Sequence, residues 1–315
     1  MFKKMIFAVL AAVAVIGCNE KDVEMPEMPD MQSGEKIQLT VNLPQTATKV
    51  TGDPTDDEVN DVQIFVFDKN GLYEASSRAT ASTLSLTCTT GEKKIVALVN
   101  APIESSVANI AELRSRTSDL SDCSAGHIVM SGELTEVLTS STTVTMQVER
   151  LAARVAVSQI TTDFELEAHQ NLSFEIKSIY LVNVAGERAY LSDNTPTTWY
   201  NKGQYVAETS LDFLRDVVAA GRVSNGDSYN TEHYFYCYPN ATATKTRLVI
   251  EAEVGGYTYY YPITLNAVEA NTAYTYNLTI TKLGSNSPDV PVADGTVNFT
   301  VTVKDWTVQN VPETI

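Results

Sequence analysis

The chain has 315 residues, enough for two domains of ordinary size, and 43% of them are hydrophobic, which excludes general disorder. Its formal net charge is −17, from 22 basic and 39 acidic residues. Because phosphate binding needs clustered Lys and Arg, this balance argues against a nucleic-acid partner. Fifteen Tyr residues, together with frequent Thr and Val, are typical of β-structure.

The N-terminus has the pattern of an export signal. Residues 1–4 include two lysines, and residues 5–16 are apolar but too few to span a bilayer as a stable helix. The sequence before Cys18 resembles the end of a bacterial lipoprotein signal peptide, which would cover residues 1–17 and leave Cys18 acylated. Acyl chains such as palmitate would anchor the mature protein to a membrane. A simple signal sequence without lipidation is the competing interpretation.

The first predicted strand follows a polar tether. Residues 18–36 lack periodicity and contain two prolines, so they are predicted to link the lipid to the first domain. Apolar and polar residues then alternate over 37–43, which predicts a half-buried strand. The apolar positions are Ile37, Leu39, Val41 and Leu43.

A polar, glycine-containing loop follows this strand, and Lys49 is the only basic residue in it. Because exposed loop tips are preferred sites of proteolysis, a trypsin-like protease is predicted to cut between Lys49 and Val50. The cut would make the strand over 37–43 removable. Its removal would cost the burial of four apolar side chains, which stabilises the fold by roughly 1.5–3 kcal/mol each. The plainer alternative is an ordinary first strand of a β-sandwich and an ordinary loop lysine.

The rest of the first half is predicted as short strands and one short helix. The helix covers 109–116, with Ser105 and Ser106 as candidate caps. The strands are predicted over 62–67, 83–89, 95–99, 128–130 and 143–148. Cys88 and Cys123 lie in this half and can pair in an oxidising compartment, but two reduced buried thiols fit the sequence equally well.

The second half begins near Glu149, where a new alternating strand starts, and it repeats the same mixture of elements. Strands are predicted over 155–160, 174–184 and 274–282, with a hairpin over 247–263 that turns at a glycine pair. A helix is predicted over 211–220 from its apolar spacing, with Gly221 after its end. The two halves therefore indicate two β-sandwich domains, over 37–149 and 150–315, with a few short helices.

The last predicted strand has the same period as the first. Apolar and polar residues alternate over 296–304, within a terminal segment that extends to residue 311. The apolar positions are Val297, Phe299, Val301 and Val303. We therefore predict that this donor strand of one copy can fill the groove that the first strand leaves in the next, by β-strand addition.

The sequence contains no motif that indicates catalysis or cofactor binding. It lacks the nucleophile elbow of hydrolases, the phosphate-binding loops and the paired histidines of zinc enzymes. His127, His169 and His233 lie far apart and without the spacing of metal ligands. We therefore predict no enzyme activity, no catalytic residues, no metal and no cofactor.

Several patterns, in their order along the chain, resemble the fimbrillin superfamily of the Bacteroidetes, the FimA-like subunits of type V pili. No single pattern is specific, and their order and spacing together carry the resemblance. One is the junction motif Glu-Arg-Leu-Ala-Ala-Arg-Val at residues 149–155. The others are Cys18 with its signal, the strand over 37–43 with Lys49, and residues 62–68, 274–281 and 301–306. The resemblance covers essentially the whole chain, and it implies tandem transthyretin-like sandwiches of Greek-key type.

The resemblance also implies a route of export, maturation and assembly. A lipid-anchored precursor would reach the outer membrane, an extracellular protease would release the first strand, and subunits would join by strand exchange into a fimbrium that supports adhesion and biofilm formation. The family is commonly cut after Arg, whereas Lys49 stands at the matching position here. Because the segment over 296–311 supplies a donor strand, a stalk subunit is favoured over an anchor. A tip adhesin, or a surface lipoprotein that binds glycan or host protein, is the alternative.

Overall fold

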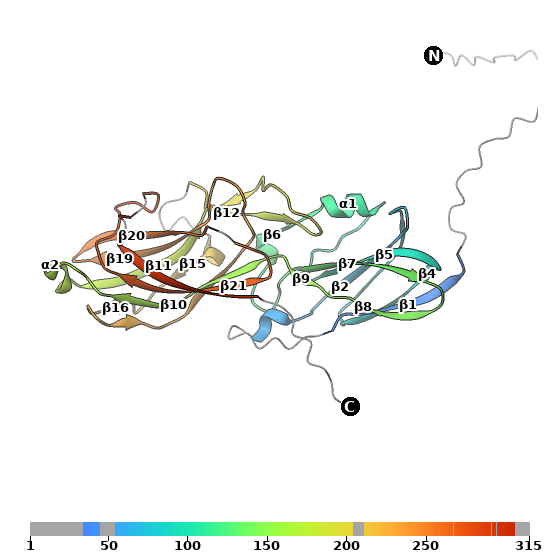
Figure 1. Cartoon of the computed structure of the whole chain (residues 1–315), viewed down its shortest axis with the longest axis horizontal. Helices are drawn as coiled ribbons and strands as arrows, with labels where there is room; N and C mark the ends of the chain where they lie inside the picture. Colours follow the sequence, from blue (N-terminus) through green and yellow to red (C-terminus); the bar gives the residue numbers. More distant parts are fainter. Residues whose placement is uncertain are drawn as a thin grey trace, which may run out of the picture. The chain divides into compact units, whose positions relative to one another are not determined.

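The computed structural model describes residues 34–44, 54–203, 211–266, 268–290, 292–293 and 295–305. These residues form a mainly β fold, as the sequence predicts (Figure 1). The predicted lipidation site at Cys18, the predicted cut between Lys49 and Val50, and residues 306–311 of the predicted donor segment lie outside this description.

The first half of the fold contains two sheets. One is three-stranded, in the order β4-β1-β8, and the other is five-stranded, in the order β3-β2-β5-β7-β9. The three-stranded sheet consists of β1 (Lys36–Asn42), β4 (Thr83–Thr89) and β8 (Thr142–Thr145). The five-stranded sheet consists of β2 (Val62–Asp68), β3 (Tyr73–Ala79), β5 (Gly91–Val99), β7 (Met130–Leu138) and β9 (Glu149–Arg150).

Strand β2 explains how these sheets become a sandwich. Its residues are apolar without alternation, which is typical of a strand that is buried on both faces. Ile64 and Val66 point into a core that they share with β1 and β4. Phe65 and Phe67 point to the opposite face, into the larger core that continues into the second half of the chain.

The second half contains two five-stranded sheets. In the first, β10 lies between β21 and the short strands β17 and β18, and β22 pairs with β21. In the second, the order is β15-β11-β19-β20, and β16 also pairs with β11. The first sheet consists of β10 (Ala153–Thr162), β17 (Ser228–Tyr229), β18 (His233–Cys237), β21 (Thr272–Ile280) and β22 (Val297–Asp305). The second consists of β11 (Phe174–Val182), β15 (Arg215–Val217), β16 (Arg222–Val223), β19 (Arg247–Val254) and β20 (Tyr257–Thr264).

The remaining elements are short. Two small strand pairs join β12 (Val184–Ala185) to β14 (Trp199–Tyr200), and β13 (Glu187–Ala189) to β6 (Thr117–Asp119). The described helices are α1 (Ile110–Ser115), α2 (Glu167–Gln170) and the 3-10 turns η1 (Pro54–Asp57), η2 (Leu120–Asp122) and η4 (Asp212–Leu214). Among the described strands, the β6–β13 pair alone joins residues before Arg150 to residues after it.

Most predicted strands are confirmed, and so are the hairpin and the first helix. Gly255 and Gly256 have φ values of 58° and 87°, as a tight turn between β19 and β20 requires. Helix α1 is capped by Asn109, whose side chain accepts from the Glu112 backbone N–H, and not by Ser105 or Ser106.

The helix predicted over 211–220 is wrong. Residues Asp212–Leu214 form a single 3-10 turn, and Arg215–Val217 form β15. The apolar spacing that suggested a helix has a different cause: Leu214 and Val218 are buried, while Val217 is exposed on the strand between them. Because β15 pairs with β11, sheet pairing overrides the local helical pattern here.

Candidate functional site: the first strand and its groove

Strand β1 is the middle strand of its sheet (Figure 1). It pairs antiparallel with β4 over its whole length, from Lys36 to Asn42. On its other side it pairs in parallel with β8, from Leu39 onward. The backbone of β1 therefore has hydrogen-bonding neighbours on both edges, and its departure would leave two strands without a partner.

The inward face of β1 is deeply buried. The exposed fractions of Ile37, Leu39, Val41 and Leu43 are 7%, 0%, 1% and 1%. Their burial contributes roughly 6–12 kcal/mol in gross terms, at 1.5–3 kcal/mol for each side chain. Since a whole domain is stable by only about 5–15 kcal/mol, an unfilled groove would threaten the fold of the first sandwich.

The groove that β1 fills is apolar along its length. Across from β1, strand β4 presents Cys88 opposite Ile37, Leu86 opposite Leu39, and Leu84 opposite Val41. All three β4 side chains are buried. The groove thus selects any strand with apolar residues at alternate positions, which is the condition for exchange of one strand for another.

The outward face of β1 contributes little to its retention. Thr40 Oγ1 lies 2.8 Å from Ser85 Oγ, and Thr83 Oγ1 donates to Asn42 Oδ1 at 2.9 Å. Both hydrogen bonds are exposed to solvent, where water competes for the same groups. Apolar burial and backbone pairing therefore account for most of the hold on this strand.

The segment that follows the predicted cut is fixed by the junction motif. In η1, Asp56 is 3% exposed and accepts a hydrogen bond from the Tyr236 hydroxyl. Arg150 pairs with Asp57, and its Nε donates to the Asp56 carbonyl oxygen at 3.2 Å. Arg154 Nε lies 3.9 Å from Asp56 Oδ2.

The two arginines are themselves held in place. Burial lowers the pKa of Arg150 to about 10, although the nearby Asp56 opposes this change. Arg150 Nη1 also donates to Asn271 Oδ1 at 3.0 Å, and Arg154 Nη2 lies 2.8 Å from Glu232 Oε1. The motif therefore ties η1, four residues beyond Val50, to the second half of the chain. We call the Asp56, Asp57, Arg150, Arg154 and Tyr236 set the junction cluster.

The predicted donor strand lies at the margin of its own sheet. Strand β22 pairs antiparallel with β21 from Val297 to Asp305, and no described strand pairs with its other edge. Val297 and Val301 are partly buried against the larger core. Phe299 and Val303 are 49% and 57% exposed, and the Phe299 ring lies 6.0 Å from that of Tyr276.

The structure keeps the two predicted exchange partners apart, because β1 and β22 belong to different sheets. In this chain the groove is therefore filled by β1 and not by β22. The junction cluster escaped prediction: the motif was noticed, but the pairing of its arginines with two aspartates some 94 residues earlier is a property of the fold.

The disulfide considered for Cys88 and Cys123 does not form, and the alternative of reduced buried thiols is the one observed. Cys88 belongs to the core beneath β1, whereas Cys123 belongs to the larger core. Cys123 Sγ lies 3.7 Å from the Tyr238 hydroxyl. The two cysteines therefore occupy separate interiors.

Over the described residues, no helix is long and apolar enough to cross a membrane, and no three His, Cys, Asp or Glu side chains group as metal ligands would.

Comparisons with known proteins show what the chain and its fold resemble. Residues 36–168 match the family model of the major fimbrial subunit protein (FimA). No curated protein matches the sequence. Many solved structures share the fold, and three of them are representative.

The first is a candidate cell adhesion protein from Bacteroides eggerthii, with 20% identity and a TM-score of 0.67, covering 87% of this chain and 97% of that one. The second is a fimbrillin, FimA, from Porphyromonas gingivalis, with 16% identity, a TM-score of 0.65 and coverage of 87% and 99%. The third is a C-terminally truncated tip fimbrial protein, Mfa3, from the same species, with 14% identity, a TM-score of 0.55 and coverage of 86% and 100%.

The family match begins at the first residue of β1 and ends beyond the junction motif, so it includes the whole first sandwich. The solved structures extend the shared fold over the second half. The predicted resemblance to the Bacteroidetes fimbrillins is thereby confirmed, by the family model over the first sandwich and by the shared fold over both halves.

Proposed function

We propose that this protein is a stalk subunit that polymerises by donor-strand exchange. It is exported as a lipoprotein acylated at Cys18 and held at the outer membrane. A trypsin-like protease then cuts between Lys49 and Val50, and the segment that contains β1 leaves. The C-terminal segment of another subunit enters the empty groove, and the resulting fimbrium supports adhesion and biofilm formation.

One observation carries this proposal. The strand predicted to leave is buried in the middle of a sheet, whereas the strand predicted to enter lies at a sheet margin and exposes Phe299 and Val303. Both strands place four apolar residues at alternate positions. An incoming strand can therefore restore the apolar burial that the first strand supplied and pair with both β4 and β8.

The junction cluster supports a clean release. Because Asp56 and Asp57 are tied to Arg150 and Arg154, the chain beyond the cut stays attached to the fold. Strand β2, which follows η1, is the second strand of its five-stranded sheet and is buried on both faces. Release therefore stops before β2, and only the β1 side of the loop can leave.

Cleavage and polymerisation can be tested together on the purified protein. Trypsin in limiting amount, followed by mass spectrometry, should report a new N-terminus at Val50, and SDS-resistant multimers should then appear. Lys49→Ala should remain uncut and monomeric under the same conditions. Persistent monomers after clean cleavage would contradict the proposal.

Cys88 provides an internal reporter of the groove. It lies opposite Ile37 and is 3% exposed, so a thiol reagent should not label it in the uncut protein. Once β1 leaves, and before another strand enters, Cys88 should become reactive. Cys123 and Cys237 are buried in the larger core and serve as matched controls that should stay unlabelled. Labelling of all three cysteines would indicate unfolding and not strand release.

A further inference from the structure

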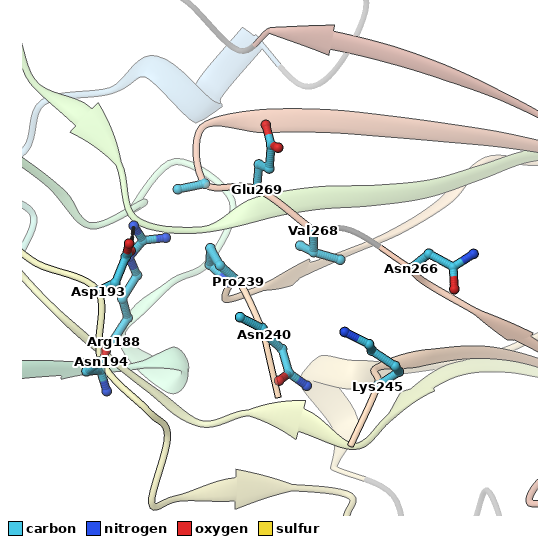
Figure 2. A pocket seen from close by; sticks show the side chains of 11 residues that line it. Arg188, Asp193, Asn194, Pro239, Asn240, Lys245, Asn266, Val268 and Glu269 are labelled. Atoms are coloured by element: carbon cyan, nitrogen blue, oxygen red, sulfur yellow. Dashed lines mark hydrogen bonds and ion pairs between the residues drawn. The ribbon is translucent and has the colours of Figure 1, made fainter. Parts of the chain in front are cut away.

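A cavity of about 560 Å³ lies in the second half of the chain. Residues from three stretches of the chain line it, beginning at Arg188, at Pro239 and at Asn266 (Figure 2). Its volume falls within the roughly 300–1,000 Å³ of typical small-molecule sites. Neither strand exchange nor the fimbrillin resemblance assigns it a role.

Arg188 on β13 forms one wall, and it is largely buried. Its side chain is only 18% exposed, and burial lowers its pKa, although the charges of Asp193 and Glu149 oppose this change. Nη1 donates to the Leu151 carbonyl oxygen at 3.2 Å, whereas Nε has no hydrogen-bond acceptor among the described residues. A buried guanidinium needs an anionic partner to offset the loss of water.

The carboxylate beside Arg188 is a weak partner. Asp193 Oδ1 lies 3.5 Å from Arg188 Nη2, at the limit of a hydrogen bond, and the Asp193 side chain is 98% exposed. An ion pair with so exposed a member contributes little, because solvent screens it. Asp193 is therefore a counter-ion that a better-placed carboxylate can replace.

A second cation reaches the same cavity. The Lys245 side chain extends toward the cavity centre, while the Glu269 carboxylate points away from it (Figure 2). Within the described part of the chain, Lys245 forms no ion pair. Two positive groups thus line one space: Arg188, with its exposed partner Asp193, and Lys245.

The remaining lining suits a hydroxyl-rich ligand. Asn194, Asn240 and Asn266 bring amides, which both donate and accept hydrogen bonds as sugar hydroxyls do. Pro239 and Val268 add small apolar surfaces against which the C–H face of a sugar ring can pack.

We propose that this cavity binds a saccharide unit that carries a carboxylate, of the uronic or sialic acid class. The sugar carboxylate replaces Asp193 beside Arg188 and pairs with Lys245, and the ring lies over Pro239 and Val268. Because the chain as a whole carries a net charge of −17, long-range repulsion opposes such a ligand, and local pairing provides the affinity. Binding at this site is independent of strand exchange.

Calorimetric titration of the uncut protein tests the assignment with glucuronic acid and N-acetylneuraminic acid, and with glucose as the neutral comparison. At least one acidic sugar should bind, and glucose should not. Lys245→Gln should weaken binding about fivefold or more, through loss of a charge-assisted contact. Lys69→Gln removes the same charge outside the cavity and should leave binding within about twofold.

Asp193→Asn gives the sharpest result, because a folding defect cannot imitate it. This exposed substitution removes the competing carboxylate, so acidic sugars should bind about twofold to fivefold more tightly. Three outcomes would overturn the proposal: no acidic sugar binds, Lys245→Gln and Lys69→Gln behave alike, or Asp193→Asn fails to tighten binding. Binding of a glutamate-rich peptide in place of the sugars would overturn the saccharide assignment.

Discussion

The first and last described strands share one sequence pattern but occupy different environments. Strand β1 has a partner on each side, and its three inward apolar side chains, with Leu43 directly after it, are almost completely buried. Strand β22 has one described partner and leaves Phe299 and Val303 about half exposed. Alternation thus defines which face of a strand is apolar, whereas the number of neighbours decides how deeply that face is buried.

This difference gives strand exchange its direction. A strand that is already fully buried gains nothing by moving, and it leaves only when the chain behind it is cut. A marginal strand with exposed apolar residues gains burial when it enters a deeper groove. The same reasoning predicts that substitutions in the two strands have unequal effects on the monomer.

The largest effect is expected at the junction cluster, which holds the chain directly behind the first strand. Arg150→Ala should lower the free energy of unfolding by about 3–5 kcal/mol, because it leaves buried carboxylates without their partner. Urea denaturation measures this change. Arg114→Ala is the control: Arg114 Nη2 lies 2.6 Å from Glu133 Oε1, but the two side chains are 43% and 27% exposed, so a loss within about 1 kcal/mol is expected. Equal losses in the free energy of unfolding for the two variants would show that the buried junction cluster stabilises the fold no more than an exposed ion pair does.

A direct comparison of the two strands comes next in size. Leu39→Ala should cost about 2–5 kcal/mol in the uncut monomer, because Leu39 is fully buried. Phe299→Ala removes a larger side chain, yet it should cost less than Leu39→Ala, since Phe299 is 49% exposed. Chemical denaturation of both variants under one set of conditions decides the point. A greater loss for Phe299→Ala would reverse the comparison.

Much of this contrast could be predicted from the sequence. Alternation located β1, β4 and β22, and the glycine pair located the β19–β20 turn. Burial depth could not be predicted, because it depends on which strands become neighbours. The helix expected over 211–220 failed for the same reason: β15 pairs with β11, and local spacing does not reveal that pairing.

Contacts between distant segments were also beyond prediction. The arginines of the junction motif lie beside Asp56 and Asp57 in the folded chain, although the two groups are far apart in the sequence. Arg188 and Lys245 meet at one cavity although 56 positions separate them in the printed sequence. Cys88 and Cys123 are closer in sequence but lie in different cores.

A pH effect is expected from the buried thiols, because burial raises the pKa of Cys88 beneath β1 as well as the pKa values of the two cysteines in the larger core. Burial raises the pKa of Cys123 to about 11 and that of Cys237 to about 12, from an ordinary value of 9.0. Below pH 9 each thiol is protonated in both the folded and the unfolded state, so the stability that it contributes is fully present. Between pH 9 and the pKa of the folded state, the thiol ionises only in the unfolded chain, so the free energy of unfolding falls. The loss is about 1.4 kcal/mol per pH unit for each thiol.

Cys237→Ala should therefore make the fall in stability between pH 9 and 11 less steep, whatever its effect at pH 8. Urea denaturation at several pH values measures the slope for the variant and for the natural chain. Parallel slopes would mean that the Cys237 thiol does not contribute to the alkaline loss.

The smallest effect on the monomer is expected at the exposed end of β22. Val303→Ser should change the free energy of unfolding by no more than about 0.5 kcal/mol, because Val303 is 57% exposed. After cleavage, however, the same variant should form fewer multimers, because a hydroxyl would enter the apolar groove. Gel filtration before and after trypsin treatment compares the two states. Unchanged multimer yield would argue that residue 303 stays outside the groove.

The exchange itself is tested most directly by a reversible lock on β1. Thr40 and Ser85 lie directly opposite each other in the β1–β4 pair, and their hydroxyl oxygens are 2.8 Å apart. Paired positions of this kind can accept a disulfide. In T40C/S85C, cleavage after Lys49 should yield no multimers while the disulfide is intact, and multimers should appear once it is reduced. Multimers that form with the disulfide intact would contradict release of the first strand as the step that permits assembly.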